Sequence, residues 1–402
     1  MKKVVFLLFW MNICTALFGQ SGDLLLELSD PLSIEEKNFF SLQVDPYYES
    51  KLKEISGKKF EIHSSDLAYN GSVLKIKSLK TRGKSTLFFT RKSFSISLKE
   101  PVILGNDEIK KLALNNLAMD HNYYRNRLSF LLMERIGIFQ LQNKFAELRI
   151  NGKSAGLYLA IQKPEDYIHS LDSPLLVRRE YEGRFTIEDA QGKYTKQQIK
   201  RLRNIPKLTK KYAGQQLYDS LNTVVHMDHY FQWLAFNYLI QNGDYTDELF
   251  LYLKTDENRF DIIPWDYDDI FMRQPHDGFE KRNKILDHKL LFSGEAYLDI
   301  VIDSDDVLYM KFLDRFREIL EILHPDFLKQ AFDDVYAELY PYYTDQEIIA
   351  QSENDYFGHT DLSTLKADLQ NHYQGMIYQR MSIQRIIDSE LLRISQENRL
   401  SD

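Results

Sequence analysis

The residue pattern changes part-way along the chain, from β-type runs to helical periodicity, and that change limits the folds that the chain can adopt. Between residues 59 and 98, short runs of β-type residues alternate with turn signals such as Asn70-Gly71, which predicts an antiparallel sheet. Residues 145–162 predict another hairpin, turning at Asn151-Gly152. From Met227 onward apolar residues recur at helical spacing, interrupted by a β-like stretch at 249–264. We therefore predict an α+β fold in which a small β-rich part precedes a larger helical part.

No linker-like tract or repeat interrupts these elements, so one continuous fold is predicted. A chain of 402 residues that is 44% hydrophobic and 27% charged is typical of globular proteins rather than disordered or collagenous ones. The net charge of -8 gives no electrostatic reason to expect nucleic acid or an anionic membrane as a partner. Strands are predicted at residues 59–62, 73–78, 86–90 and 93–98, and helices at 122–136, 227–241, 306–323, 325–340 and 362–389.

Residues 1–20 predict a secretory signal peptide. Lys2 and Lys3 precede an apolar stretch that is shorter than the roughly 20 residues a spanning helix needs. We therefore expect an exported protein, periplasmic, on the cell surface or extracellular, with no membrane span in the mature chain. A retained anchor and lipidation of Cys14 are the alternatives. Since Cys14 is the sole cysteine, the mature chain can form no disulfide and no cysteine-ligated metal site.

Two acidic segments, at 244–248 and 266–269, bracket the β-like stretch. A hairpin returns its two ends to one place, so Asp244 and Asp266 should face one another across the strand ends. Phosphoryl transfer needs such carboxylates, one to accept the hydroxyl proton of the acceptor and others to hold Mg²⁺. A turn beside a solvated acidic loop, and a calcium-binding loop, are the other interpretations of the same residues.

Seven motifs in a fixed order resemble the CotH kinases, which are atypical secreted protein kinases like spore coat protein H. The likeness spans roughly residues 59–387 and implies a bilobal kinase-like fold, with a β-rich lobe at 21–165 and a mainly helical lobe at 166–402. The motifs are 82–86 (RGKST), 91–96 (RKSFSI), 112–115 (LALN), 124–128 (YRNRL), 147–152 (ELRING) with 156–158, 242–244 (NGD) and 262–268 (IIPWDYD).

The resemblance implies transfer of the ATP γ-phosphoryl group to Ser or Thr of a protein substrate, with Mg²⁺ or Mn²⁺. Asp244 stands in the place of the catalytic aspartate, Asp266 in that of the metal-binding aspartate, and Asp268 in that of a second metal ligand.

Three cations are candidates for contact with ATP phosphates. Lys92 lies between two predicted strands, Arg82 precedes a glycine, and Arg125 begins a predicted helix. The alternatives are a solvated edge lysine, an arginine that shapes a turn, and a helix cap with a surface salt bridge.

The sequence departs from the family pattern at two positions. Glu248 stands where members often have Asn after the catalytic aspartate, so we expect it to ligate the metal with a changed charge. Gln162 stands near the expected hinge, where members often have Glu-Lys, and can hydrogen-bond the nucleotide base without an ionic pair. The first departure leaves open a non-catalytic surface or adhesion protein with a kinase-like fold, and the same carboxylates leave open a metal-dependent hydrolase. His226 and His229 are interpreted as helix-face residues rather than zinc ligands.

Overall fold

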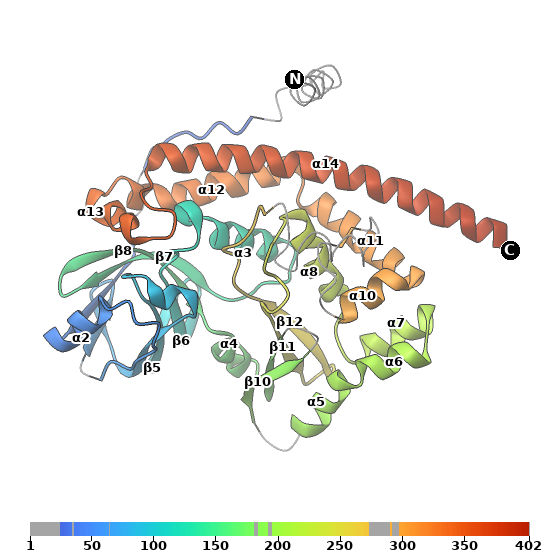
Figure 1. Ribbon diagram of the computed structural model, residues 1–402, viewed down its shortest axis with the longest axis horizontal. Coiled ribbons are helices and arrows are strands. Elements are labelled where there is room, and N and C mark those ends of the chain that lie inside the picture. The colour runs from blue at the N-terminus through green and yellow to red at the C-terminus, as the bar shows by residue number, and fades with distance from the viewer. Residues whose placement is uncertain are drawn as a thin grey trace.

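The computed structural model describes residues 25–33, 36–63, 65–180, 184–191, 195–272, 290–291 and 297–401. The protein is mixed α+β, as predicted, with an eight-stranded sheet, a four-stranded sheet and flanking helices (Figure 1). The predicted signal peptide lies outside the described residues. The division into lobes at residues 165 and 166 stays a prediction.

The larger sheet has the strand order β3-β2-β1-β7-β8-β6-β5-β4. Its β7–β8 hairpin turns at Asn151-Gly152, where both residues have positive φ, so this prediction is confirmed. The parallel pairing of β1 with β7 was not predicted, since the turn signals indicated only antiparallel strands. The strands are β1 (Phe39–Val44), β2 (Ser65–Tyr69), β3 (Ser72–Leu74), β4 (Ile76–Arg82), β5 (Ser93–Leu104), β6 (Asp107–Asn115), β7 (Asn143–Ile150) and β8 (Lys153–Gln162).

Four of the predicted elements differ from the structure. The strand predicted at 73–78 is divided at residue 75 between β3 and β4. The strand predicted at 86–90 is the 3-10 helix η1 (Ser85–Phe88). Its Leu87 carbonyl accepts a hydrogen bond from the Lys92 ammonium instead of pairing with a neighbouring strand. The strand predicted at 59–62 forms an isolated bridge through Glu61. The helix predicted to begin at 122 is α3 (Arg125–Arg135), because positive φ at Asn122 and the following residue prevents an earlier start.

Both faces of the larger sheet are buried near its centre. Along β8, Leu157, Leu159 and Ile161 belong to the main hydrophobic core, which also contains the apolar face of α3. Tyr158 and Ala160 point to the opposite face, into a smaller core over which α2 (Pro46–Leu52) packs. The alternation is what a two-residue strand period requires.

The smaller sheet has the order β10-β9-β11-β12, and the four long helices predicted after Met227 are present as α8, α11, α12 and α14. Helix α14 runs along α12 and α11 across the top of Figure 1. Among the described residues, no helix is both long and apolar enough to cross a membrane. These elements are β9 (Leu175–Arg179), β10 (Phe185–Ala190), β11 (Leu249–Lys254), β12 (Arg259–Pro264), α4 (Pro164–Ser170), α5 (Thr195–Arg203), α6 (Ile205–Lys211), α7 (Gly214–Asn222), α8 (Met227–Leu239), α10 (Tyr297–Ser304), α11 (Asp306–Ile322), α12 (Pro325–Tyr343), α13 (Gln346–Ile349), η4 (Ala350–Asn354) and α14 (Leu362–Ser401).

Gly156 of β8 is required by a close approach as well as by its backbone. Its φ is +94°, and a Cβ there would lie 2.9 Å from Gln351 Cβ and 3.1 Å from the Arg91 guanidinium. Gly152 has a φ of +80° and no atom within 4 Å of such a Cβ. We expect Gly156→Ala to lower the free energy of unfolding by about 3 kcal/mol and Gly152→Ala by about 1 kcal/mol, since the first adds overpacking to backbone strain. Urea unfolding of both variants measures the difference, and equal losses would contradict the packing argument.

Candidate phosphoryl-transfer site

The β11–β12 hairpin brings the two acidic segments together, as predicted. Leu249 pairs with Pro264, and one residue further out the Trp265 N–H donates to the Glu248 carbonyl at 3.0 Å. The last residues before β11 therefore lie beside Trp265 and Asp266, the first two residues after β12.

Asp244, Asp247 and Glu248 form an acidic cluster in which one carboxylate oxygen of each lies within 4.8 Å of the others. Asp247 Oδ1 and Glu248 Oε2 are buried and have no hydrogen-bond partner among the described residues. Burial, and then the charge of Asp266, holds the pKa of Glu248 well above its usual range. Converging hard oxygens with unused lone pairs are the ligands that Mg²⁺ or Mn²⁺ would take.

Arg178 of β9 is the counter-ion of the acidic cluster, and sequence reasoning missed it. Its Nη2 donates to Glu248 Oε1 at 2.8 Å and lies 3.7 Å from Asp247 Oδ2, and its Nε donates to the Asp247 carbonyl at 3.0 Å. The one available signal was an arginine pair at the end of an otherwise apolar strand. Asp247 was also missed as a candidate ligand, although it lies between two residues that were predicted.

Asp266 and Asp268 line a small cavity, the Asp266 cavity, together with Arg82, Asn115 and Asn126. Its volume is about 60 Å³. Its other lining residues are Gly83, Thr86, Ser93, Asn116, Leu117, Ala118 and Met119.

Arg82 is the cation of the Asp266 cavity. Its Nη1 donates to Asn115 Oδ1 at 2.7 Å, and its guanidinium lies 5.5 Å from the centre of the Trp265 ring. Burial raises the pKa of Asp266, and the charge of Arg82 opposes that rise. Burial, followed by the charge of Asp266, holds the pKa of Asp268 well above its usual range. The structure thus brings Arg82, Asp266 and Asp268 together.

The N-terminus of α3 holds the segment that carries these two aspartates. Arg125 Nη1 donates to the Asp268 carbonyl at 3.2 Å, and Asn126 Oδ1 accepts from the Tyr267 N–H at 2.9 Å. Asp120 in turn accepts from the backbone N–H groups of Arg125 and Asn126 at 2.9 and 3.0 Å. Arg125 therefore lies where it was predicted, whereas the role of Asp120 as a helix cap was missed.

The structure does not bring Lys92 and Gln162 into this site. The Lys92 ammonium donates to the carbonyls of Leu87, at 2.7 Å, and Phe89, and so fastens η1. Gln162 Nε2 donates to Asp166 Oδ2 at 3.1 Å, at the start of α4. Their predicted contacts with a nucleotide stay predictions, and the observed contacts give both residues a structural role.

The model of the CotH kinase protein family matches residues 79–377, well over half of the chain. The chain belongs to the CotH kinase protein family. The matched region contains the acidic cluster and the Asp266 cavity, and the resemblance seen in the seven motifs is confirmed.

Inner spore coat protein H of Bacillus subtilis (strain 168) is 24% identical over 249 residues, which are 56% of this chain and 62% of that relative. Two solved structures are weakly similar. The Helicobacter pylori proinflammatory kinase CtkA has a TM-score of 0.32 at 10% identity, covering 75% of this chain and 96% of that chain. The complex of HipA, HipB and operator DNA from Shewanella oneidensis MR-1 has a TM-score of 0.31 at 12% identity, covering 83% and 67%. Scores of this size carry no conclusion about fold.

The Asp120 carboxyl predicts a pH dependence of stability. Burial raises the pKa of Asp120 to about 7, so between about pH 4 and pH 7 the folded chain keeps a proton that the unfolded chain releases. The free energy of unfolding should therefore fall as the pH rises through this window, by up to about 1.4 kcal/mol per pH unit from this group. We expect Asp120→Asn to make the fall shallower in urea unfolding at pH 4 to 7.5.

Asp345 provides the control, because it also caps a helix. A hydrogen bond from Lys37 lowers the pKa of Asp345, so its contribution to stability is complete above about pH 4. Asp345→Asn should leave the slope from pH 4 to 7 unchanged, and an unchanged slope in Asp120→Asn as well would contradict the assignment.

Proposed function

We propose that this protein is a secreted protein Ser/Thr kinase with a bilobal, kinase-like fold, which transfers the ATP γ-phosphoryl group to a protein hydroxyl in a reaction that needs Mg²⁺ or Mn²⁺. The observation that carries the proposal is the convergence of two acidic segments, with unused buried carboxylate oxygens, beside the Arg82 guanidinium. Such an arrangement matches the needs of phosphoryl transfer, where positioning and electrostatic stabilisation supply most of the catalysis.

Asp266, Asp268 and Glu248, joined by Asp247, would hold the divalent cation. When bound, the cation neutralises phosphate charge and orients the transferred group. Asp244, the most N-terminal carboxylate of the acidic cluster, would accept the proton of the attacking hydroxyl. The donor set fits a hard cation, because each of these side chains offers carboxylate oxygens.

Arg82 and Arg125 would contact the phosphates. Arg125 Nε is buried and has no hydrogen-bond partner among the described residues, so one donor of this guanidinium is available to an anion. The loop that carries Gly83 and Thr86 lines the Asp266 cavity beside Arg82. Lys92 fastens the far end of that loop through Leu87 and Phe89.

Export by the signal peptide at residues 1–20 and a place in a coat or on a surface complete the proposal. The second of these is supported by the relative that is named as an inner spore coat protein. A protein substrate with Ser or Thr acceptors is expected from the family resemblance.

A non-catalytic surface protein is the second candidate function. The ion pair of Arg178 with Glu248 favours it, because the guanidinium already satisfies one oxygen of a proposed ligand. Incubation of the mature chain with γ-labelled ATP and Mg²⁺ or Mn²⁺ separates the candidates. Label on the chain itself or on a Ser-rich acceptor supports the kinase. Absence of nucleotide binding supports the second candidate, and free phosphate without labelled protein indicates a hydrolase.

Replacement of Asp266 tests the metal role. In the parent, ATP with Mg²⁺ at 100 times its Kd should add about 2.7 kcal/mol to the free energy of unfolding. We expect Asp266→Asn to lose most of this gain, because phosphates beside carboxylates without the cation meet like charge. Asn tolerates the φ of +56° at this position. Asp256→Asn, in the exposed turn at the other end of the same hairpin, should keep the gain. The same ATP-dependent shift in both variants would reject the metal role.

Replacement of Asp244 tests the proton acceptor. Base catalysis by a positioned group is worth roughly 10² to 10⁴ in rate, so Asp244→Asn should lose that much phosphoryl transfer and keep ATP affinity within about threefold. A turn aspartate without a catalytic role would instead cost about 1 kcal/mol of stability with little kinetic effect. Single-turnover transfer and thermal melting of both proteins decide, and normal transfer with a lowered melting temperature excludes the assignment.

A further inference from the structure

The segment of residues 116–123, which joins β6 to α3, is strained and forms one wall of the Asp266 cavity. Leu117, Asn122 and Tyr123 have φ values of 56°, 56° and 64°, although none is a glycine. Residues in this region cost about 1 to 3 kcal/mol each and persist where their surroundings hold them. The 116–123 segment also carries Asp120, the cap that holds the start of α3. The conformation of the 116–123 segment therefore sets the cavity wall and the start of α3, and other side chains must stabilise this strained conformation.

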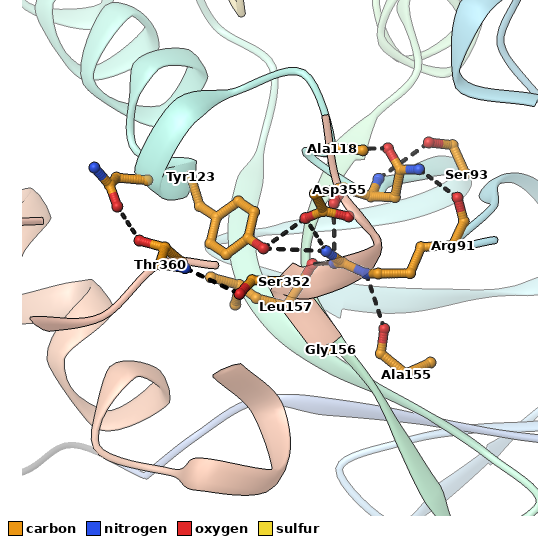
Figure 2. A network of polar contacts seen from close by, with 12 residues as sticks. Arg91, Ser93, Ala118, Tyr123, Ala155, Gly156, Leu157, Ser352, Asp355 and Thr360 are labelled. Atoms are coloured by element: carbon orange, nitrogen blue, oxygen red, sulfur yellow. Dashed lines mark hydrogen bonds and ion pairs between the residues drawn. The ribbon is translucent and has the colours of Figure 1, made fainter. Parts of the chain in front are cut away.

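Arg91 holds the 116–123 segment through hydrogen bonds near both of its ends (Figure 2). All five guanidinium N–H groups have acceptors: the carbonyls of Asn116 at 2.9 Å and Ala155 at 3.1 Å, the Leu157 carbonyl, the Tyr123 hydroxyl at 3.2 Å and the Asp355 carboxylate. Arg91 is only 5% exposed, so these contacts lie outside the reach of bulk water. One side chain thus joins strand β8 to both ends of the strained segment.

Asp355 brings a distant part of the chain to the same place. It follows η4, 264 residues after Arg91, and its side chain is 3% exposed. The Tyr123 hydroxyl donates to Asp355 Oδ2 at 2.5 Å, and the next residue, Tyr356, donates its N–H to the Ala118 carbonyl at 3.1 Å. The region between α13 and α14 therefore binds the wall of the Asp266 cavity directly.

A second layer of hydrogen bonds passes this constraint to the cavity. The Asn116 N–H donates to Ser93 Oγ at 3.0 Å, and Asn116 Nδ2 donates to the Arg91 carbonyl at 2.6 Å. Ser93 and Asn116 both line the Asp266 cavity. On the α3 side, Asp120 holds the helix start whose side chains bond to the backbone of residues 267 and 268.

We propose that Arg91 and Asp355 are positioning residues for the phosphoryl transfer proposed above, and the inference rests on that proposed function. The hydrogen bonds of Arg91 and Asp355 described above go to the framework and not to the acidic cluster. They act through the 116–123 segment, which sets α3 and, through Arg125 and Asn126, the place of Asp268. The C-terminal region around Asp355 thus positions the residues of the site, although it contributes no catalytic residue.

Asp355→Asn is the test, because it keeps the shape of the side chain and removes the charge that faces Arg91. Glu338→Gln is the matched control. Glu338 on α12 pairs with buried Arg127 of α3 at 2.7 and 2.8 Å, a second long-range Arg–carboxylate contact that does not touch the 116–123 segment. Both variants should lose stability. At a temperature where both are folded, we expect kcat for transfer to fall about tenfold or more in Asp355→Asn, with KM for the protein acceptor within about twofold, and both constants to stay within about twofold of the parent in Glu338→Gln.

Hydrogen exchange tests whether Asp355 holds the 116–123 segment without requiring that the protein transfers phosphoryl groups. Backbone amides at 116–126 should exchange about tenfold faster in Asp355→Asn and not in Glu338→Gln. A parent without transfer activity would reject the proposed function, and the exchange result would still decide whether Asp355 holds the segment. If Asp355→Asn fails to fold, Tyr123→Phe replaces it, since it removes one hydrogen bond from the same carboxylate and should give the same pattern at smaller size. Parent-like kcat and exchange in the folded variant, or equal losses in the control, would overturn the inference.

Discussion

Burial of like charge at one place is the constraint on which the rest of this structure depends. Carboxylates from three segments meet where the smaller sheet approaches α3, and burial raises the pKa of several of them. The charges of Arg82, Arg125 and Arg178, from three different elements, oppose this rise in pKa. Two buried carboxylate oxygens, Asp247 Oδ1 and Glu248 Oε2, still have no hydrogen-bond partner among the described residues. A group of this kind is stable only where a rigid framework holds it, and a divalent cation would relieve the remaining repulsion. The carboxylates are Asp120, Asp244, Asp247, Glu248, Asp266 and Asp268.

The framework holds the two sides of the site in different ways. On one side, regular pairing of β11 with β12 fixes the acidic segments through backbone hydrogen bonds, so their separation follows from sheet geometry. On the other side the ends of β4, β5, β6 and α3 line the cavity together with the irregular 116–123 segment, and side chains hold that segment. Arg91 suits that task because a planar guanidinium offers five donors in fixed directions, which lysine cannot. Gly156 leaves the room that Arg91 occupies.

Features that follow from neighbouring residues were predicted from the sequence, whereas contacts between residues far apart in the chain were missed. The hairpin turns and the four long helices follow from turn residues and apolar periodicity, and the acidic segments converge because a hairpin must return. Nothing local pairs Arg91 with a carboxylate 264 residues away, or places Arg178 opposite Glu248. Lys92 illustrates a finer limit. Ser93, the first residue of β5, lines the Asp266 cavity, whereas the preceding Lys92 bonds to the Leu87 carbonyl, so a one-residue difference decides which side chain faces the site.

Glu248 stands where the family resemblance leads us to expect Asn, and Arg178 lies beside it. An Asn there would be neutral and would offer one carbonyl oxygen to a cation. Glu248 adds a negative charge and a second oxygen, but Arg178 supplies the opposite charge and takes Oε1. The other oxygen of Glu248, Oε2, is buried and has no hydrogen-bond partner among the described residues. Because Arg178 holds one oxygen of Glu248 and the other has no partner among the described residues, Glu248 can offer a cation one oxygen, as the expected Asn would, so the difference is compatible with a cation-dependent site.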